Sequence, residues 1–208
     1  MARKSFQELL LKNIRTGNGP TRSKQSMDWF KKNLVKISSS RTGSGRVESE
    51  SATTIRSWTN LGLGSMYFVH YNPKHKDTLK YYDNFPLIIP IERYNDGILG
   101  LNLHYLPPTF RARLLDALME TVNDPTLDDG AKMRINYQIL SSVVKNKLFA
   151  PCIKRYLGKH FTSQFIKIHP SSWENSIYLP VEDFKKATKQ EVWKDSKAII
   201  SGKRRGRR

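Results

Sequence analysis

The chain of 208 residues contains a single cysteine, Cys152. One thiol excludes an internal disulfide and any zinc site built from several cysteines. It also favours a reducing cytosolic setting, in which free thiols persist. Cys152 follows Pro151, where a helix start would lower the pKa of its thiol. The favoured interpretation is nevertheless a small, buried hydrophobic side chain.

Long apolar runs are also missing. No stretch approaches the roughly 18 consecutive apolar residues that a membrane-spanning helix requires. The first residues contain no apolar segment of the kind found in secretory signals. We therefore expect no membrane partner and no export signal.

The sequence lacks the signatures of common catalytic sites. It has no metal-ligand spacing, no glycine-rich phosphate loop and no nucleophile elbow. His70, His75 and His104 lie near aspartates in the sequence, but none forms a helical i, i+4 pair, and a structural role is favoured for His104. We therefore expect a protein that is not an enzyme and has no cofactor or metal. A nuclease stays open as an alternative, with Asp83 and Asp96 as candidate magnesium-binding carboxylates.

Acidic residues are scarce. Lysine and arginine number 36 against 18 aspartates and glutamates, so the net charge is +18. Residues 1–60 hold 12 basic and 4 acidic residues, residues 61–120 hold 6 and 6, and residues 121–208 hold 18 and 8. Between residues 131 and 173 there are eight basic residues and no acidic one. Such a run indicates a polyanionic partner, most often nucleic acid, whereas a solvated basic face without a specific partner is the alternative.

Candidate DNA contacts come from this acid-free run and from the C-terminus. Lysine and arginine bind phosphates without reading sequence, and no helix-turn-helix or zinc-finger pattern appears. Aromatic residues between Tyr67 and Phe85 are weaker candidates for stacking on a terminal base pair, and a place in the core is favoured for them. The predicted DNA-binding residues are Lys145, Lys147, Lys154, Arg155, Lys159, Lys203, Arg204, Arg205, Arg207 and Arg208.

Strand signals concentrate between residues 66 and 106. Residues 98–106 alternate, with Leu99, Leu101, Leu103 and Tyr105 on one side, which is typical of a half-buried strand. Residues 86–94 form an apolar run before it, and Asn95-Asp96-Gly97 predicts a tight antiparallel hairpin between the two. Pro90 cannot donate a ladder hydrogen bond, so that strand should lie at an edge or bulge there. Residues 66–71 and 165–168 are further strand candidates, and residues 72–85 should form an ordered loop.

Helix signals lie on both sides of these strands. Ser5 and Glu8 have the spacing of a capping box. Pro107-Pro108 should start a helix with Phe110, Leu114 and Leu118 on its apolar face, packed on the leucines of the hairpin. Further helices are predicted from about residue 129 to 148, from Pro151 through Phe161, and from Pro180 to about Trp193.

These signals predict an α+β fold: a small antiparallel β-meander or partly closed barrel, packed by several helices, with basic N- and C-terminal extensions. The predicted boundaries are a basic helical extension at 1–45, a flexible linker at 46–64, an α+β core domain at 65–196 and a basic disordered tail at 197–208.

Several motifs resemble the DNA end protector family of T-even-like contractile-tailed bacteriophages. The most specific are YDNFPL at 82–87 and GLNLHYLPP at 100–108, and IKRYLGKH at 153–160 and FTSQFIKIHPSSWENSIYLPVEDFK at 161–185 fit the same pattern. The resemblance covers about residues 60–196.

The resemblance implies a virion protein that binds the ends of packaged double-stranded DNA, shields them from host exonuclease and supports head completion. The implied partners are DNA ends and phage head, portal or neck proteins, and the implied locations are the virion and, during assembly, the host cytoplasm. It supplies no catalytic residue. The alternative is a neck or baseplate component whose basic flanks bind partner proteins.

Overall fold

The computed structural model describes Ser5, Glu8 and Leu11, then residues 52–122, 149–173, 177, 179 and 181–202. Ser5 and Glu8 form the predicted capping box: the Ser5 amide donates to the Glu8 carboxylate at 3.2 Å, and the Glu8 amide donates to the Ser5 hydroxyl at 3.1 Å. The remainder of the predicted N-terminal extension, the helix near 129–148 and the residues from 203 onward lie outside the described residues.

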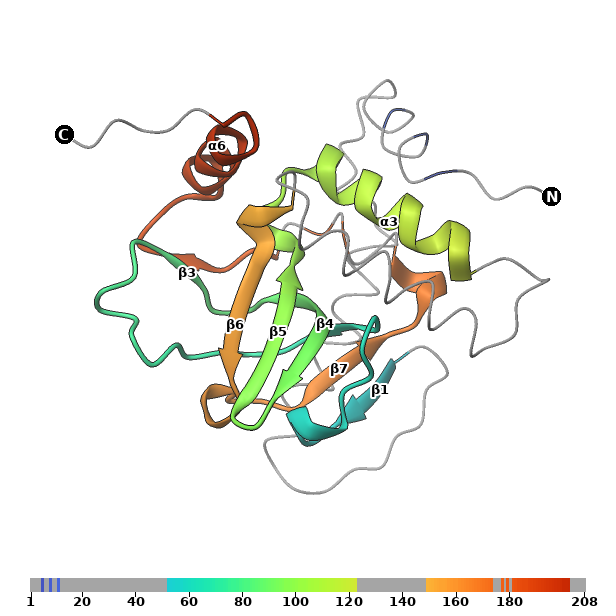
Figure 1. The fold of residues 1–208 in the computed structure, drawn as a ribbon, viewed down its shortest axis with the longest axis vertical. Coiled ribbons are helices and arrows are strands. Elements are labelled where there is room, and N and C mark those ends of the chain that lie inside the picture. The colour runs from blue at the N-terminus through green and yellow to red at the C-terminus, as the bar shows by residue number, and fades with distance from the viewer. Residues whose placement is uncertain are drawn as a thin grey trace.

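The described chain is built on a six-stranded sheet (Figure 1). The strand order is β1-β7-β2-β4-β5-β6, and every pairing is antiparallel. The strands are β1 (Ala52–Ile55), β2 (Met66–Phe68), β4 (Leu87–Tyr94), β5 (Gly97–Asn102), β6 (Ile153–Leu157) and β7 (Phe165–Ile168). The α+β class and the β2-β4-β5 meander are therefore confirmed, and within the described residues the sheet does not close into a barrel.

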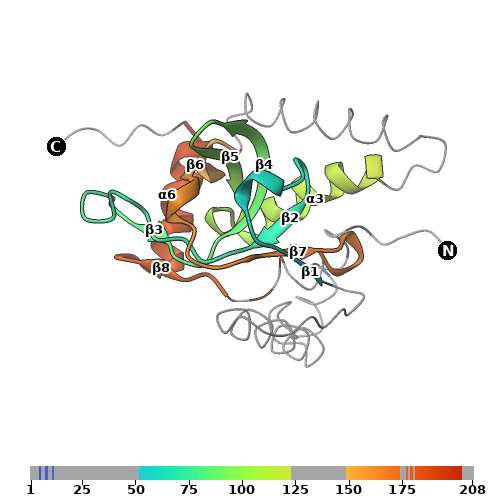
Figure 2. The ribbon, with the colours of Figure 1, turned by 90° about the horizontal axis from the view of Figure 1, so that it is seen from below.

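A second, two-stranded sheet joins β3 (Tyr82–Asp83) to β8 (Phe184–Lys185). Two α-helices are described, α3 (Pro108–Val122) and α6 (Lys189–Ile200). Figures 1 and 2 place the small sheet and α6 together at one end of the molecule, away from β1 and β7. No helix in the described ranges is long and apolar enough to cross a membrane.

The predicted hairpin is confirmed in detail. β4 and β5 are joined by a two-residue turn, Asn95-Asp96. The register shifts directly after Pro90, which therefore sits at a bulge in an inner strand rather than at an edge. Gly97 must be glycine, because a Cβ atom there would collide with the carbonyl oxygen of Tyr156 on β6.

Both faces of this sheet are buried. On one face, leucines of β5 and of the turn after it pack with Ala112, Leu114 and Leu115 of α3, which confirms the predicted core between hairpin and helix. The second face carries buried side chains of β2, β4, β5, β6 and β7, and Trp58 of the 3-10 helix at Trp58–Asn60 packs against them. The prediction of a half-buried strand over residues 98–106 was wrong, because Asn102 and His104 are also buried and β5 ends at Asn102.

The helix predicted from Pro151 is wrong. Ala150–Cys152 forms a single 3-10 turn, and β6 follows it and pairs with β5 over five residues. Pairing with an exposed strand edge outweighed the weak helical spacing of the apolar residues. Cys152 is fully buried, and this burial raises the pKa of its thiol to about 12, so its interpretation as a buried hydrophobic side chain is confirmed.

The last helix begins later than predicted. Instead of starting at Pro180, the chain forms β8, and α6 begins after Thr188. The Thr188 hydroxyl accepts the Glu191 amide at 3.3 Å, and the Glu191 carboxylate accepts the Thr188 amide at 2.8 Å. This capping box fixes the start of α6, which continues to Ile200, past the predicted boundary at residue 196.

The sheet also begins earlier than predicted, since β1 lies within the segment interpreted as a linker and pairs with β7.

Replacing Thr188 with alanine should lower the free energy of unfolding by about 1 kcal/mol, because the first turn of α6 loses its side-chain acceptor. Urea unfolding measures the change. Gln190→Ala, at an exposed position of the same helix, is the control and should stay within about 0.5 kcal/mol of the parent. Equal losses in the two variants would contradict a capping role.

Candidate nucleic-acid interface

Two of the residues considered for catalysis, His104 and Asp83, form a buried pair. Nδ1 of His104 lies 2.7 Å from the Asp83 carboxylate, and the side-chain amide of Asn102 donates to the same oxygen at 2.9 Å. The second Asp83 oxygen accepts the backbone amide of Phe85 at 3.1 Å. These side chains are enclosed, which supports the structural interpretation of His104 and leaves Asp83 unable to meet a substrate. In the described part of the chain, no group of three or more His, Cys, Asp or Glu residues is placed to hold a metal ion.

Arg111 is the most deeply buried cation of the described residues, at 1% exposure. Its guanidinium donates to the carbonyls of Leu106 at 2.7 Å and Ile177 at 2.9 Å, and to the Glu182 carboxylate at 2.6 Å. Burial acts to raise the pKa of Glu182, but the charge and hydrogen bond of Arg111, with smaller contributions from His104 and a backbone hydrogen bond, together hold that pKa below its ordinary value. Arg111 therefore joins α3 to the chain segment that leads into β8 and α6.

Three of the predicted DNA-binding residues lie among the described residues. The ammonium of Lys154 packs 3.9 Å from the ring centroid of Tyr105, and its burial lowers its pKa. The guanidinium of Arg155 is ion-paired with Asp96 and donates to two backbone carbonyls of the sheet. Lys159 is exposed. Lys159 is therefore open to solvent, and Lys154 and Arg155 also make contacts within the fold; DNA binding by these three residues stays a prediction.

The other predicted DNA-binding residues cannot be placed. They lie outside the described residues and are Lys145, Lys147, Lys203, Arg204, Arg205, Arg207 and Arg208.

The aromatic residues considered for base stacking are mostly internal. Tyr67, Tyr71 and Phe85 are buried, which confirms their place in the core. Tyr81 is partly buried and packs against the cluster that contains Tyr105. Tyr82 of β3 is partly buried as well, so no member of this group is a fully exposed platform for a terminal base pair.

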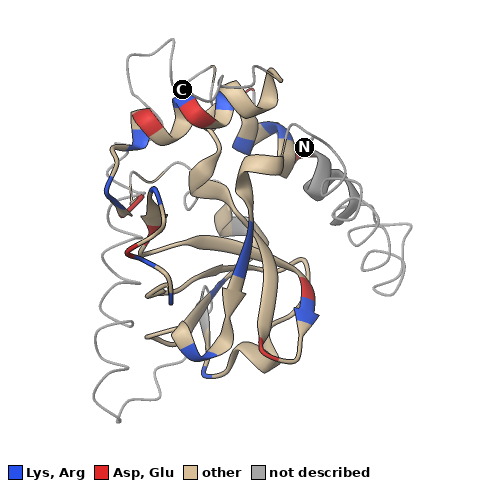
Figure 3. Ribbon diagram, turned by 60° about the vertical axis from the view of Figure 1, so that its left-hand side comes forward, with Lys and Arg blue, Asp and Glu red and all other residues tan. Residues whose placement is uncertain are grey.

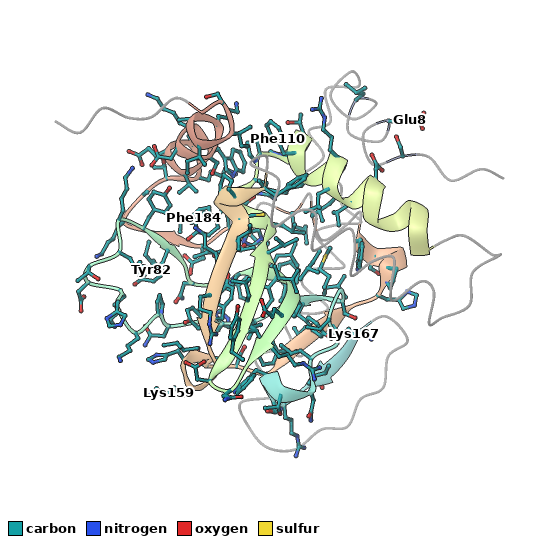
Figure 4. All side chains as sticks on the ribbon, viewed as in Figure 1. Glu8, Tyr82, Phe110, Lys159, Lys167 and Phe184 are labelled. Atoms are coloured by element: carbon teal, nitrogen blue, oxygen red, sulfur yellow. The ribbon has the colours of Figure 1, made fainter. Side chains whose placement is uncertain are left out.

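A row of lysines occupies the end of the molecule formed by the 72–81 loop, the small sheet and α6. We call it the basic margin. Figure 3 shows lysine or arginine along α6 and on the neighbouring loop and strands, and Figure 4 shows Lys159 and Tyr82 on this side of the molecule. The basic margin consists of Lys74, Lys76, Lys80, Lys159, Lys185, Lys186, Lys189, Lys194 and Lys197.

Three contacts hold the parts of the basic margin together. The Asn72 amide donates to the His160 carbonyl at 3.0 Å, which places Lys159 beside the start of the loop. Lys186, directly after β8, donates to backbone carbonyls in the middle of the loop. Lys80 forms an ion pair with Asp195 of α6. Segments about a hundred residues apart in sequence thus form one surface.

The carboxylates of the basic margin are few, and most are engaged. Residues 72–82 and 183–202 contain eight lysines and four acidic residues. Asp183 pairs with Lys185 at 2.7 Å, and Glu191 caps α6. The surface therefore carries a net positive charge. In sequence it is followed directly by residues 203–208, which contain five more basic residues.

Sequence reasoning missed most of this surface. The charge balance of residues 61–120 is neutral, which concealed the KHK triplet at 74–76. The acids that balance it, such as Asp83 and Asp96, are buried or paired elsewhere in the fold. The adjacent lysines at 185 and 186 were a local signal, but only the pairing of β3 with β8 shows that they lie beside the loop.

Comparison with known proteins supplies the remaining information. Among curated proteins and among solved structures, no match was found. The profile of a family described as the phage T4 terminal DNA protecting protein matches residues 2–197. This match confirms the resemblance seen in residues 60–196 and extends it through the N-terminal region. The chain therefore belongs to the phage T4 terminal DNA protecting protein family.

Proposed function

We propose that this protein binds the ends of packaged double-stranded DNA in the phage particle, shields them from host exonuclease and supports head completion. The observation that carries the proposal is the family match over residues 2–197. The basic margin supplies a surface suited to it, since exposed lysines bind the phosphate backbone.

Phosphate contacts suit a protein that must cover a DNA end of any sequence. Backbone contacts position a protein on a duplex but carry no sequence information. A protein held at the last turns of a duplex occupies the place that an exonuclease needs. We propose as DNA contacts the exposed lysines of the basic margin other than Lys186, whose ammonium donates to backbone carbonyls, together with Lys203–Arg208.

Binding without cleavage is part of the proposal. The two aspartates that a nuclease would need are already engaged, Asp83 with His104 and Asp96 with Arg155. Incubating linear duplex with the protein and magnesium should therefore leave the DNA intact. Cleavage that is lost in an Asp83→Asn or Asp96→Asn variant would support the nuclease alternative instead.

Exonuclease protection tests the function directly. Linear duplex labelled at one end, mixed with the purified protein, should lose its label more slowly under a double-strand exonuclease than duplex alone. A variant with Lys74, Lys76 and Lys194 changed to alanine should protect less. The control removes two exposed charges outside the basic margin, Arg56→Ala and Arg113→Ala, and should protect like the parent.

The competitor DNA decides whether ends are recognised. Covalently closed circular duplex should compete weakly for the protein, and short linear duplex strongly. Equal competition would leave DNA binding standing but remove end recognition. Absence of any protection, combined with binding to phage heads that lack this protein, would favour the neck-component alternative.

A further inference from the structure

The ammonium group of Lys186 donates its hydrogen bonds to backbone carbonyl oxygens of the 74–79 turn. Its ammonium donates to the carbonyl oxygens of Lys76 at 2.6 Å, Asp77 at 2.8 Å and Leu79 at 3.2 Å. An ammonium has three N–H donors, and here three carbonyls converge on it. Lys186 is also, within the described residues, the one non-glycine residue with positive φ, at 67°. A residue with a side chain adopts this conformation only where its surroundings fix it.

The loop that Lys186 holds is a single turn with its own hydrogen bonds. The amides of Thr78 and Leu79 both donate to the His75 carbonyl at 3.1 Å. The next carbonyls of the turn point to Lys186, much as a cation sits at the C-terminal end of a helix. Lys74 and Lys76 are exposed on this turn.

Holding the turn in one conformation matters for an anion partner. Ordering a loop and its side chains on binding costs free energy, and a loop that is already ordered avoids that cost. We propose that Lys186 is a positioning residue for DNA: it fixes the 74–79 turn so that the ammonium groups of Lys74 and Lys76 meet two phosphates of the backbone. This inference rests on the proposed function and adds to it the residue that organises the contact.

Lys185 provides a matched control for Lys186. Both are exposed lysines and neighbours in the chain at the end of β8, but the ammonium of Lys185 pairs with Asp183, whereas that of Lys186 donates to the turn. Lys186→Met and Lys185→Met remove the same charge. Lys186→Met should weaken binding to linear duplex about tenfold more than Lys185→Met, the loss that corresponds to roughly 1.4 kcal/mol of added ordering cost. In the free protein, hydrogen exchange at the Thr78 and Leu79 amides should accelerate in Lys186→Met alone.

A double-mutant cycle separates positioning from charge and from general destabilisation. In a background with Lys74→Ala and Lys76→Ala, adding Lys186→Met should cost no more affinity than adding Lys185→Met. An undiminished tenfold difference in that background would overturn the inference, as would unchanged exchange at Thr78 and Leu79. If the parent protects DNA ends but Lys74→Ala with Lys76→Ala binds as the parent does, the inference fails and the proposed function stands. If the parent gives no protection, the proposed function itself fails.

Discussion

Replacing Arg111 with methionine should lower the free energy of unfolding by about 3–5 kcal/mol, the loss typical of breaking a buried ion pair from one side. The change leaves the Glu182 carboxylate buried, with its side chain 3% exposed and without its partner. It also removes the donors to the carbonyls of Leu106 and Ile177. Chemical unfolding followed by circular dichroism measures the effect.

The control for this prediction lies two residues along the same helix. Arg113 is exposed, so Arg113→Met should stay within about 0.5 kcal/mol of the parent. Adding Glu182→Leu to Arg111→Met should recover part of the loss, because two apolar side chains need no buried partner. If the double variant is less stable than the single one, the pair is not the source of the effect.

The same pair predicts how stability depends on pH. Burial raises the folded-state pKa of Glu182, but Arg111 and the other contacts of the carboxylate together bring it below its ordinary value of 4.5. The contribution of this group to stability is therefore fully present above pH 4.5 and is lost as the pH falls through the folded-state pKa. In Arg111→Met this loss of stability at low pH should be absent. The difference in unfolding free energy between parent and variant should therefore become smaller as the pH falls below 4.5.

Affinity for linear duplex should fall about a thousandfold between 50 and 200 mM salt. If about six lysines and arginines of the basic margin and of residues 203–208 reach phosphates, the slope of log affinity against log salt is near −5. Neutralising one phosphate contact should reduce the slope by about one unit, with little dependence on DNA sequence. Titrations in a mobility or anisotropy assay at several salt concentrations measure it.

Removing Lys203 to Arg208 isolates the contribution of the C-terminal charges. Residues 203–208 are five basic residues and one glycine, with no apolar side chain, so we expect the deletion to flatten the salt dependence and leave the unfolding free energy unchanged. A matched chain in which these residues are replaced by serine and glycine controls for length. Binding that is indifferent to salt would contradict phosphate contact as the main source of affinity.

Local sequence signals predicted the parts of the fold that local forces decide. The β4–β5 hairpin, its bulge at Pro90 and the start of α3 at Pro108 follow from the backbone restrictions of proline and glycine, and all were confirmed. The capping box of Ser5 and Glu8 is equally local. The β6 strand was missed because Ile153, Tyr156 and Leu157 fit either spacing, and only the open edge of β5 decides between them.

The candidate DNA-binding surface was harder to predict, because the sequence shows which residues are charged but not which way their side chains point in the fold. Lys154 lies in the acid-free run that points to nucleic acid, yet its ammonium packs on a buried tyrosine ring. Lys186 is one of many lysines in the sequence, and nothing local shows that three carbonyls of a distant turn will surround it. Pairing of residues about a hundred positions apart creates the basic margin, and such pairings leave no periodic signal.

The pairing of β1 with β7 also determines when the sheet can be completed. Among the described residues, β1 has β7 as its strand partner, although more than a hundred residues separate them in the chain. At a synthesis rate of about 5–20 residues per second, β1 leaves the ribosome on the order of ten seconds before β7 exists. During that interval β1 is an unpaired strand, the kind of edge that recruits foreign strands. Two of the four residues in the β1 sequence ATTI are threonines, a polar content that suits a segment that stays in solution until its neighbour is made.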